Sequence, residues 1–246
     1  YFCLTYLESE YMKATLYTIE CISNLHVGSG QDNDGVIDGL IQRDVVTDHP
    51  CINASSLKGA LREHCEKWNK AHNEDAEKVN VVKLFGKKVG GEENCEAGEY
   101  RFLDASILSI PRPSVNAPFV QVTCDEVVTE LQGKASLFGV GLGDNEKETI
   151  LDLANVLEPN KCSYKDFKKY SNNDELPVIA RNCLEKGVSK NLWYEQVLPR
   201  KSRLAFFILH NDGEINKAFD SAITSVPVQI GANASVGYGI CVIKKC

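Results

Sequence analysis

A strand, a helix and a strand follow one another twice along this chain, and this order constrains the fold more than any other feature. Strands are predicted where apolar and polar side chains alternate, and helices where apolar residues recur three and four positions apart. We expect strands at 13–25, 101–110, 202–210 and 237–245, and helices at 53–70 and 214–226. Because paired strand–helix–strand units typify split βαβ folds, we predict an α+β fold with a ferredoxin-like core.

Insertions and one hairpin are expected to interrupt this core. The charged and glycine-rich residues 71–99 predict a loop, and residues 112–135 predict extended structure with loops. Residues 136–175 are interpreted as a second insertion that is partly helical. Residues 176–198 predict a protruding β-hairpin with its turn at 185–187.

Met12 is the only methionine, and the first predicted strand begins directly after it. Residues 1–11 are therefore interpreted either as an upstream or artificially added extension or as a natural N-terminal arm. Residues 12–246 are interpreted as a single domain, since a chain of this length can bury one large core.

Charge is unevenly distributed along the chain. The net charge is −7, which argues against a generic nucleic-acid binder, because phosphate affinity comes from clustered Lys and Arg. Residues 181–203, however, contain six basic and two acidic side chains, whereas residues 31–49 contain five aspartates and one arginine. This segregation suits a protein that binds phosphate through its basic region and uses its acidic region for a different purpose.

The composition excludes several other classes of protein. The ten cysteines form no C-x-x-C pair and no zinc-ligand spacing with histidine, so we expect reduced thiols, several of them in the core. No apolar run approaches the roughly 20 residues that span a bilayer, and the start of the chain has no signal-peptide pattern. We expect a cytoplasmic protein with no membrane partner.

Two segments in the first quarter of the chain suit phosphate binding. The loop HVGSG, residues 26–30, could cradle a phosphate with its backbone N–H groups, although such a loop alone is more often a structural turn. The segment SSLKGALR, residues 55–62, opens a helix whose free N–H groups attract anions. Either serine could instead simply cap a surface helix with solvated cations.

Two further segments stand in the last quarter. In NLWYEQVLP, residues 191–199, Trp193 and Tyr194 lie among basic residues and could stack on bases, or they could belong to the core. In QIGANASVGYG, residues 229–239, a run of small residues would let the backbone approach a nucleic-acid strand closely.

Taken together and in this order, these segments resemble the RAMP superfamily of CRISPR proteins. Within it the chain is most similar to the backbone subunits of type III-B (Cmr) complexes. The resemblance rests on HVGSG, GVIDGLIQRD and SSLKGALR, then on NLWYE and QIGANASVGYG, and it is patchy over 70–175. The chain departs from the family pattern at Leu40 and Ala232, where proline and glycine often stand.

The resemblance implies a modified RNA-recognition-motif fold in which the hairpin is a thumb. It implies an RNA-guided complex in which copies stack head to tail along a CRISPR guide RNA beside other Cmr subunits. A bound single-stranded target RNA would be cut at regular intervals by Asp38, with a divalent metal, Mg²⁺ or Mn²⁺, held by the same residue. His26 is a candidate acid, base or phosphate contact, and Asp32 and Asp34 are interpreted as solvated charges. The expected RNA contacts are Gly28, Ser29, Gly30, Arg43, Ser55, Ser56, Lys58, Arg62, Arg181, Lys186, Trp193, Tyr194, Gly231, Asn233, Ser235 and Gly237.

Other interpretations stay open at this point. The chain could be a guide-RNA scaffold that does not cut, the related type III-A backbone subunit, or a RAMP endonuclease that processes guide precursors. An unrelated enzyme that uses the glycine-rich loop for a small nucleotide is a fourth hypothesis, which tight binding of ATP or NAD would support.

Overall fold

A computed structural model describes residues 12–30, 36–72, 78–87, 96–156, 160–211 and 214–246. The segment 1–11, interpreted above as an extension, lies outside the described residues, as do Asp32 and Asp34. The strands are β1 Lys13–Cys21, β2 Cys51–Ile52, β3 Arg101–Phe102, β4 Ala105–Arg112, β5 Val120–Val122, β6 Val178–Glu185, β7 Val188–Gln196, β8 Arg203–His210, β9 Val228–Gln229 and β10 Ile240–Lys245. The helices are α1 Ala54–Ala71, α2 Val81–Phe85, α3 Asp125–Leu137, α4 Glu146–Ala154, α5 Tyr164–Ser171 and α6 Lys217–Thr224.

One antiparallel sheet forms the centre of the molecule. Its strands lie in the order β2-β4-β8-β1-β10-β9, with β3 beside β8 and β5 beside β4. β1 and β8 are central, and their middle residues, Leu16–Ile19 and Leu204–Ile208, are buried because most of these side chains are large and apolar. Tyr17 and Phe206 are direct partners in register, and their rings stack at 5.4 Å. The α+β class is therefore confirmed, while the ferredoxin-like description stays a prediction.

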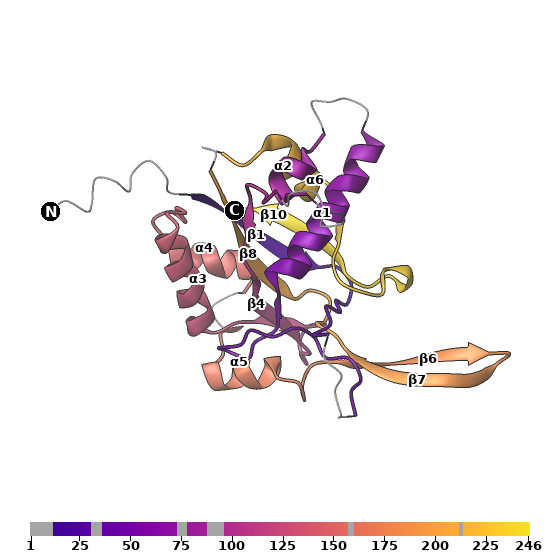
Figure 1. The fold of residues 1–246 in the computed structure, drawn as a ribbon. Coiled ribbons are helices and arrows are strands. Elements are labelled where there is room, and N and C mark those ends of the chain that lie inside the picture. Colours follow the sequence, from indigo (N-terminus) through magenta and orange to yellow (C-terminus); the bar gives the residue numbers. More distant parts are fainter. Residues whose placement is uncertain (1–11, 31–35, 73–77, 88–95, 157–159, 212–213) are drawn as a thin grey trace, which may run out of the picture.

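All the described α-helices except α5 lie in two groups around this sheet. Figure 1 shows α1, α2 and α6 on one side and α3 and α4 on another. Helix α1 buries Leu57, Leu61 and Cys65 at the predicted spacing, and His64 Nε2 lies 2.8 Å from the carbonyl oxygen of Ala222 in α6. Among the described helices, none combines the length and the apolar character that crossing a bilayer requires.

The predicted hairpin is confirmed, and it projects from the body of the molecule (Figure 1). Strands β6 and β7 form a two-stranded sheet separate from the central one. Lys186 and Gly187 have φ values of 50° and 82°, the left-handed conformation that a two-residue hairpin turn requires. Residues 182–192 are all exposed. The outer hairpin therefore contributes little to the core, and its exposed length is free to contact another molecule.

Several predicted boundaries were wrong. Residues 112–135 contain helix α3 as well as extended structure, and residues 71–99 contain the short helix α2. The strand expected at 101–110 is divided into β3 and β4. Helix α1 begins after Asn53, so neither serine of SSLKGALR caps it. The Ala54 N–H instead donates to Asp104 Oδ1 at 2.6 Å, a partner that lies in the link between β3 and β4.

A buried histidine ties the loop before β2 to α5. His49 is 5% exposed, and its Nδ1 lies 2.9 Å from Ser171 Oγ. Its ring packs edge-on against Phe167 with centroids 5.3 Å apart. Burial lowers the pKa of His49, and the positive charge of Lys168 lowers it further. His49 is therefore neutral in the folded protein under conditions in which an exposed histidine is partly charged.

This neutral histidine predicts a loss of stability in mild acid. The unfolded chain takes up a proton at His49 near the ordinary pKa of about 6.5, whereas the folded chain does so only at lower pH. The stabilising contribution is complete above that value and is lost as pH falls through the lowered folded-state pKa. Urea unfolding at about pH 7.5 and about pH 5.5 should show a smaller pH effect in His49→Phe than in the parent. Equal pH effects in the two proteins would contradict the assignment.

Candidate nucleic-acid interface

Asp38 lies at the surface, at the root of the hairpin. Its N–H donates to the Tyr194 carbonyl at 3.0 Å, and its Oδ2 accepts a hydrogen bond from the Tyr194 N–H at 2.7 Å. Gly39 bridges Glu195 in parallel register, and the Gln196 N–H donates to the Gly39 carbonyl at 2.8 Å. The segment that carries Asp38 is thus fastened along β7 like a short extra strand. Within the described part of the chain the other carboxylate oxygen, Oδ1, accepts no hydrogen bond.

Glu195 joins three separate parts of the chain. Its Oε1 accepts a hydrogen bond from Trp193 Nε1 at 2.9 Å, and its Oε2 accepts from Arg181 Nη1 at 3.2 Å and from Asn233 Nδ2 at 2.7 Å. Burial alone would raise the pKa of Glu195, but the hydrogen bonds from Trp193 and Arg181 and the charge of His26 lower it below its ordinary value. Glu195 is therefore an ionised carboxylate that fastens both hairpin strands to the glycine-rich loop after β9.

His26 is buried behind the Asp38 segment rather than exposed to solvent. It is 7% exposed, and its Nδ1 lies 2.7 Å from the Gln196 carbonyl, which can only accept, so Nδ1 carries a hydrogen. A Cβ at Gly28 would approach His26 Nε2 at 3.2 Å, and a Cβ at Gly39 would approach its Cε1 at 3.3 Å. The two glycines let the loop lie over the imidazole ring. This geometry favours a structural role for His26 over direct proton transfer.

Two glycines of the C-terminal loop, residues 229–239, are required by close contacts within the chain itself. A Cβ at Gly231 would lie 2.3 Å from the His26 carbonyl oxygen, and one at Gly239 would lie 1.9 Å from the Ile230 carbonyl oxygen. Ala232 donates its N–H to the His26 carbonyl at 2.9 Å and has no positive φ, so alanine fits where the family often has glycine. Close approach of a nucleic acid is thus not needed to explain Gly231.

The outer part of this loop is open. Ser235 and Gly237 are exposed, and a Cβ at Gly237 would meet nothing within 4 Å. Asn233 adopts the left-handed conformation with φ 66° while its side chain binds Glu195. Ser235 and Gly237 therefore remain candidates for RNA contacts, whereas Asn233 already has an intramolecular partner.

Gln42 connects the first loop to helix α1. Its Nε2 donates to the Gly28 carbonyl at 3.2 Å and to Ser56 Oγ at 2.9 Å, and its Oε1 accepts from the Asn53 N–H at 2.8 Å. One side chain therefore sets the distance between the glycine-rich loop, where Ser29 and Gly30 are exposed, and the start of α1.

The basic candidate residues differ in whether they already pair with other groups of the chain. Arg62 pairs with Glu66 at 3.2 Å. Arg43 Nε donates to Asn173 Oδ1 at 2.7 Å, and its guanidinium holds the Asp48 carbonyl. Lys58 is half-buried near the start of α1, and Ser55 is exposed. Arg43 thus has a structural task, whereas Ser55 and Lys58 can reach a ligand.

On the hairpin, the aromatic candidates lie at its root and Lys186 lies at its tip. Arg181 stands opposite Trp193, with its guanidinium carbon 5.7 Å from the centre of the indole ring and 5.8 Å from that of Tyr238. Tyr194 is about one-third exposed beside Asp38. The structure therefore brings the Asp38 segment, the glycine-rich loops and the hairpin root together, and it leaves Lys186 apart from them.

Sequence reasoning missed the residues that hold this site together. Glu195, Gln196 and Gln42 bridge the segments, yet none was a candidate. The signals available for Glu195 were its place in the NLWYE motif and its negative charge within a strongly basic stretch. Nothing local distinguishes the two glutamines, because their partners are remote in sequence.

A divalent metal could be held here only in part by the protein. Among the described residues no three His, Cys, Asp or Glu side chains gather into a metal-binding group. Asp38 offers one free and exposed carboxylate oxygen. This donor suits a hydrated Mg²⁺ or Mn²⁺ ion that takes its remaining ligands from water and from RNA phosphates.

Comparisons with known proteins agree on one family. The family model of the RAMP superfamily matches residues 18–242. The CRISPR system Cmr endoribonuclease Cmr4 of Pyrococcus furiosus is 28% identical over 230 residues, which are 92% of this chain and 74% of that protein.

Solved structures show the same fold. A type III-B Cmr-beta structure bound to cognate target RNA contains a chain with a TM-score of 0.71 and 23% identity, covering 96% of this chain and 98% of that one. The crystal structure of oligomeric Cmr4 from Pyrococcus furiosus gives a TM-score of 0.66 at 20% identity, covering 95% of this chain and 99% of that one.

Proposed function

The chain belongs to the RAMP superfamily, and we propose that it is the guide-RNA-binding backbone subunit of a cytoplasmic type III-B CRISPR complex that cuts bound target RNA. Its partners would be a CRISPR guide RNA, a single-stranded target RNA, further copies of itself and other Cmr subunits. The 28% identity to a Cmr endoribonuclease along most of the chain supports this choice within the superfamily.

The observation that carries the proposal is the place of Asp38. Its carboxylate is exposed at the foot of a projecting hairpin, and both its backbone and its side chain are hydrogen-bonded to Tyr194. A strand of RNA that meets the hairpin would pass the free Oδ1. Asp38 is held through Oδ2 and presents Oδ1 to solvent.

The chemistry required is modest. In RNA cleavage the 2′-oxygen attacks the adjacent phosphorus and its proton passes to a base or to water. The bond to the 5′-oxygen breaks, and that oxygen takes up a proton from water. In-line attack needs a distorted backbone, which a hairpin inserted between nucleotides would produce. Asp38 would offer its free oxygen to a divalent ion at this distorted point, and the ion, when bound, would supply positive charge to the phosphate.

We expect chelation to stop cleavage without releasing RNA. Excess EDTA should reduce the cleavage rate of a guide-loaded complex by about 100-fold or more, because the phosphate charge is then uncompensated. Binding of the labelled target should persist, since base pairing with the guide holds it. Adding Mg²⁺ or Mn²⁺ back should restore cutting. Full activity in EDTA would show that cleavage needs no divalent metal and would contradict this part of the proposal.

One observation favours the alternative of a scaffold that does not cut. Asp38 Oδ2 caps the Tyr194 N–H, so the aspartate would be retained as a structural group even without catalysis. Both functions share the RNA-binding surface and differ only in what Oδ1 does.

The proposal is tested by what the protein carries when it is purified. The assembled complex should contain short RNAs with a uniform 5′ sequence, and a labelled RNA complementary to them should be cut into fragments that differ by a constant length. Cutting of precursor repeat RNA by the free subunit would instead indicate a guide-processing enzyme. A protein without bound RNA that binds ATP or NAD tightly would contradict the assignment to a CRISPR complex.

A further inference from the structure

A rigid apolar turn stands on an acidic part of the surface. Val45 is 99% exposed and Val46 is 87% exposed. Asp44 Oδ1 accepts hydrogen bonds from the Val46 N–H at 3.0 Å, the Thr47 N–H at 2.7 Å and the Thr47 hydroxyl at 2.9 Å. The two valines are therefore held outward by a fixed turn, which leaves their apolar surface in water unless something covers it.

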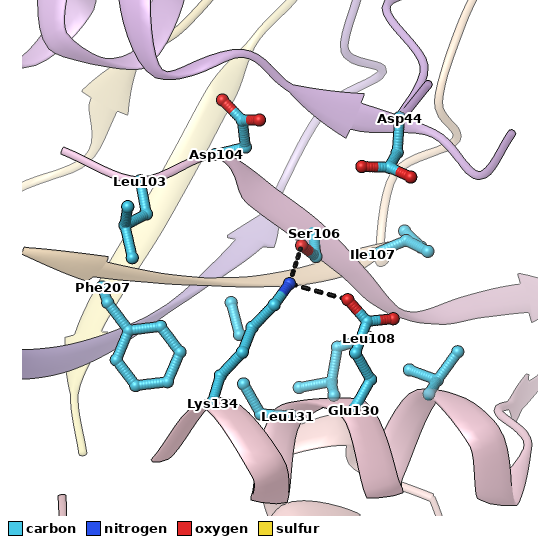
Figure 2. A pocket seen from close by; sticks show the side chains of 12 residues that line it. Asp44, Leu103, Asp104, Ser106, Ile107, Leu108, Glu130, Leu131, Lys134 and Phe207 are labelled. Carbon is cyan, nitrogen blue, oxygen red and sulfur yellow. Dashed lines mark hydrogen bonds and ion pairs between the residues drawn. The ribbon is translucent and has the colours of Figure 1, made fainter. Parts of the chain in front are cut away.

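The surroundings of this turn suit a protein better than a nucleic acid. Figure 2 shows that Asp44, Asp104 and Glu130 surround a pocket of about 180 Å³ between β4 and α3. Lys134 is the only cation among the residues that line it, and it is already paired with Glu130 at 2.7 Å. These three carboxylates repel phosphate. Together with the exposed valines beside them, they would attract a surface that is apolar and positively charged.

A groove of that kind lies where the hairpin joins the sheet. Its volume is about 490 Å³, and its walls are mainly proline and other apolar side chains, including Ile110, Pro118 and Phe119. Arg112, Arg200 and Lys201 also line it, against one acidic residue, Glu175.

The cations of the groove are not equally free. Arg112 pairs with Glu175 at 3.1 Å, and Lys201 pairs with Glu20 at 2.8 Å. Arg200 is exposed and forms no ion pair within the described ranges of the chain, so it is free to meet a carboxylate from outside.

We propose that the turn Asp44–Asp48 of one copy docks into the hairpin-root groove of the next copy. The inference rests on the proposed function, because it gives the surfaces through which backbone subunits would stack. Val45 and Val46 would pack against the apolar walls of the groove, and the aspartates of the turn would face Arg200. Apolar shape and charge are complementary on both sides.

The two surfaces cannot satisfy each other within one copy. Asp44 lies beside Ser106 and Ile107 in the first half of β4, whereas the groove is lined by Ile110 and Arg112 at the end of that strand. The exposure of Val45 shows that it does not occupy the chain's own groove. A turn on one surface and a groove on another make a heterologous contact, which repeats from copy to copy and builds an open filament.

Mixing two variants tests this contact. Val45→Glu combined with Val46→Glu damages the turn but leaves the groove intact, and Arg200→Glu combined with Pro118→Glu does the reverse. The full-length proteins are analysed by sedimentation velocity, alone and on a single-stranded RNA long enough for several copies. Without RNA, each variant alone should sediment as a monomer, whereas an equimolar mixture should form dimers and nothing larger, because only one intact turn–groove pair can form. On RNA, each variant alone should load copies without the cooperativity of the parent.

Val82→Glu is the matched control, since Val82 is a half-exposed valine on α2, away from both surfaces. It should assemble like the parent, and circular dichroism should show that every variant is folded. A turn variant that still assembles like the parent would overturn the docking contact alone. A parent protein that forms no oligomer even on RNA would overturn the proposed backbone function, and the contact with it.

Discussion

Replacing Asp38 by alanine is expected to abolish cutting of target RNA while the complex still assembles on guide RNA. The change removes the free Oδ1 that faces solvent at the hairpin root and the cap on the Tyr194 N–H. Loss of a group that acts on the reacting atoms typically slows a reaction by about 100-fold to 10,000-fold. The backbone hydrogen bond from the Asp38 N–H to the Tyr194 carbonyl remains, so the root of the hairpin should keep its position. The measurement is the single-turnover cleavage rate of a labelled target by guide-loaded complex.

Two further variants separate catalysis from capping. Asp38→Asn keeps an oxygen that can accept from Tyr194 but loses the charge, so a catalytic carboxylate predicts a loss as large as that of alanine. Asp152→Ala removes an exposed aspartate from α4 and should cut at the parent rate. If Asp38→Ala binds target RNA and cuts it normally, the chain is a scaffold at this position and the cleaving residue lies elsewhere.

Much of the fold can be predicted from local sequence patterns, and the predictions that were wrong failed for physical reasons. The strands at β1, β8 and β10 and the helices α1 and α6 were predicted because each repeats one period over enough residues. Helix α3 was missed because Val127, Val128 and Thr129 favour strands and prolines precede it, although Leu131 and Ala135 complete a helical stripe. The cap of α1 was misplaced because the partner of its first N–H, Asp104, lies in the link between β3 and β4, 50 residues away in sequence.

The candidate site was predictable in outline only. The resemblance pointed to Asp38, the glycine-rich loops and the hairpin, and the structure brings these segments together. The NLWYE motif contains Glu195 but did not reveal its bridging role, since two of its three partners are 14 and 38 residues away in sequence. Nor did the resemblance foresee that Gly231 is required by the His26 carbonyl. Residues that hold a site together act through tertiary contacts, which leave no periodic signal in one sequence.

Replacing Glu195 by alanine is expected to misplace the site without unfolding the protein. Arg181, Trp193 and Asn233 would each lose the hydrogen bond that now fastens them to one carboxylate. Because Glu195 and Arg181 are only partly exposed, we expect the free energy of unfolding to fall by about 2 kcal/mol. The root of the hairpin carries Tyr194, which positions Asp38. A shift of about 1 Å there would slow cleavage by about 100-fold.

A positioning role and a merely stabilising role predict different results for graded changes. Glu195→Gln can still accept from Trp193 but cannot form the ion pair with Arg181, so its cleavage rate should fall between those of the parent and Glu195→Ala. Glu99→Ala, which breaks a surface pair with Lys83 at 3.4 Å, should change neither stability by more than about 0.5 kcal/mol nor cleavage. If stabilising conditions such as lower temperature restored full cleavage to Glu195→Ala, the carboxylate would serve stability alone. If its rate stays low while target binding is normal, Glu195 sets the position at which Asp38 meets the RNA.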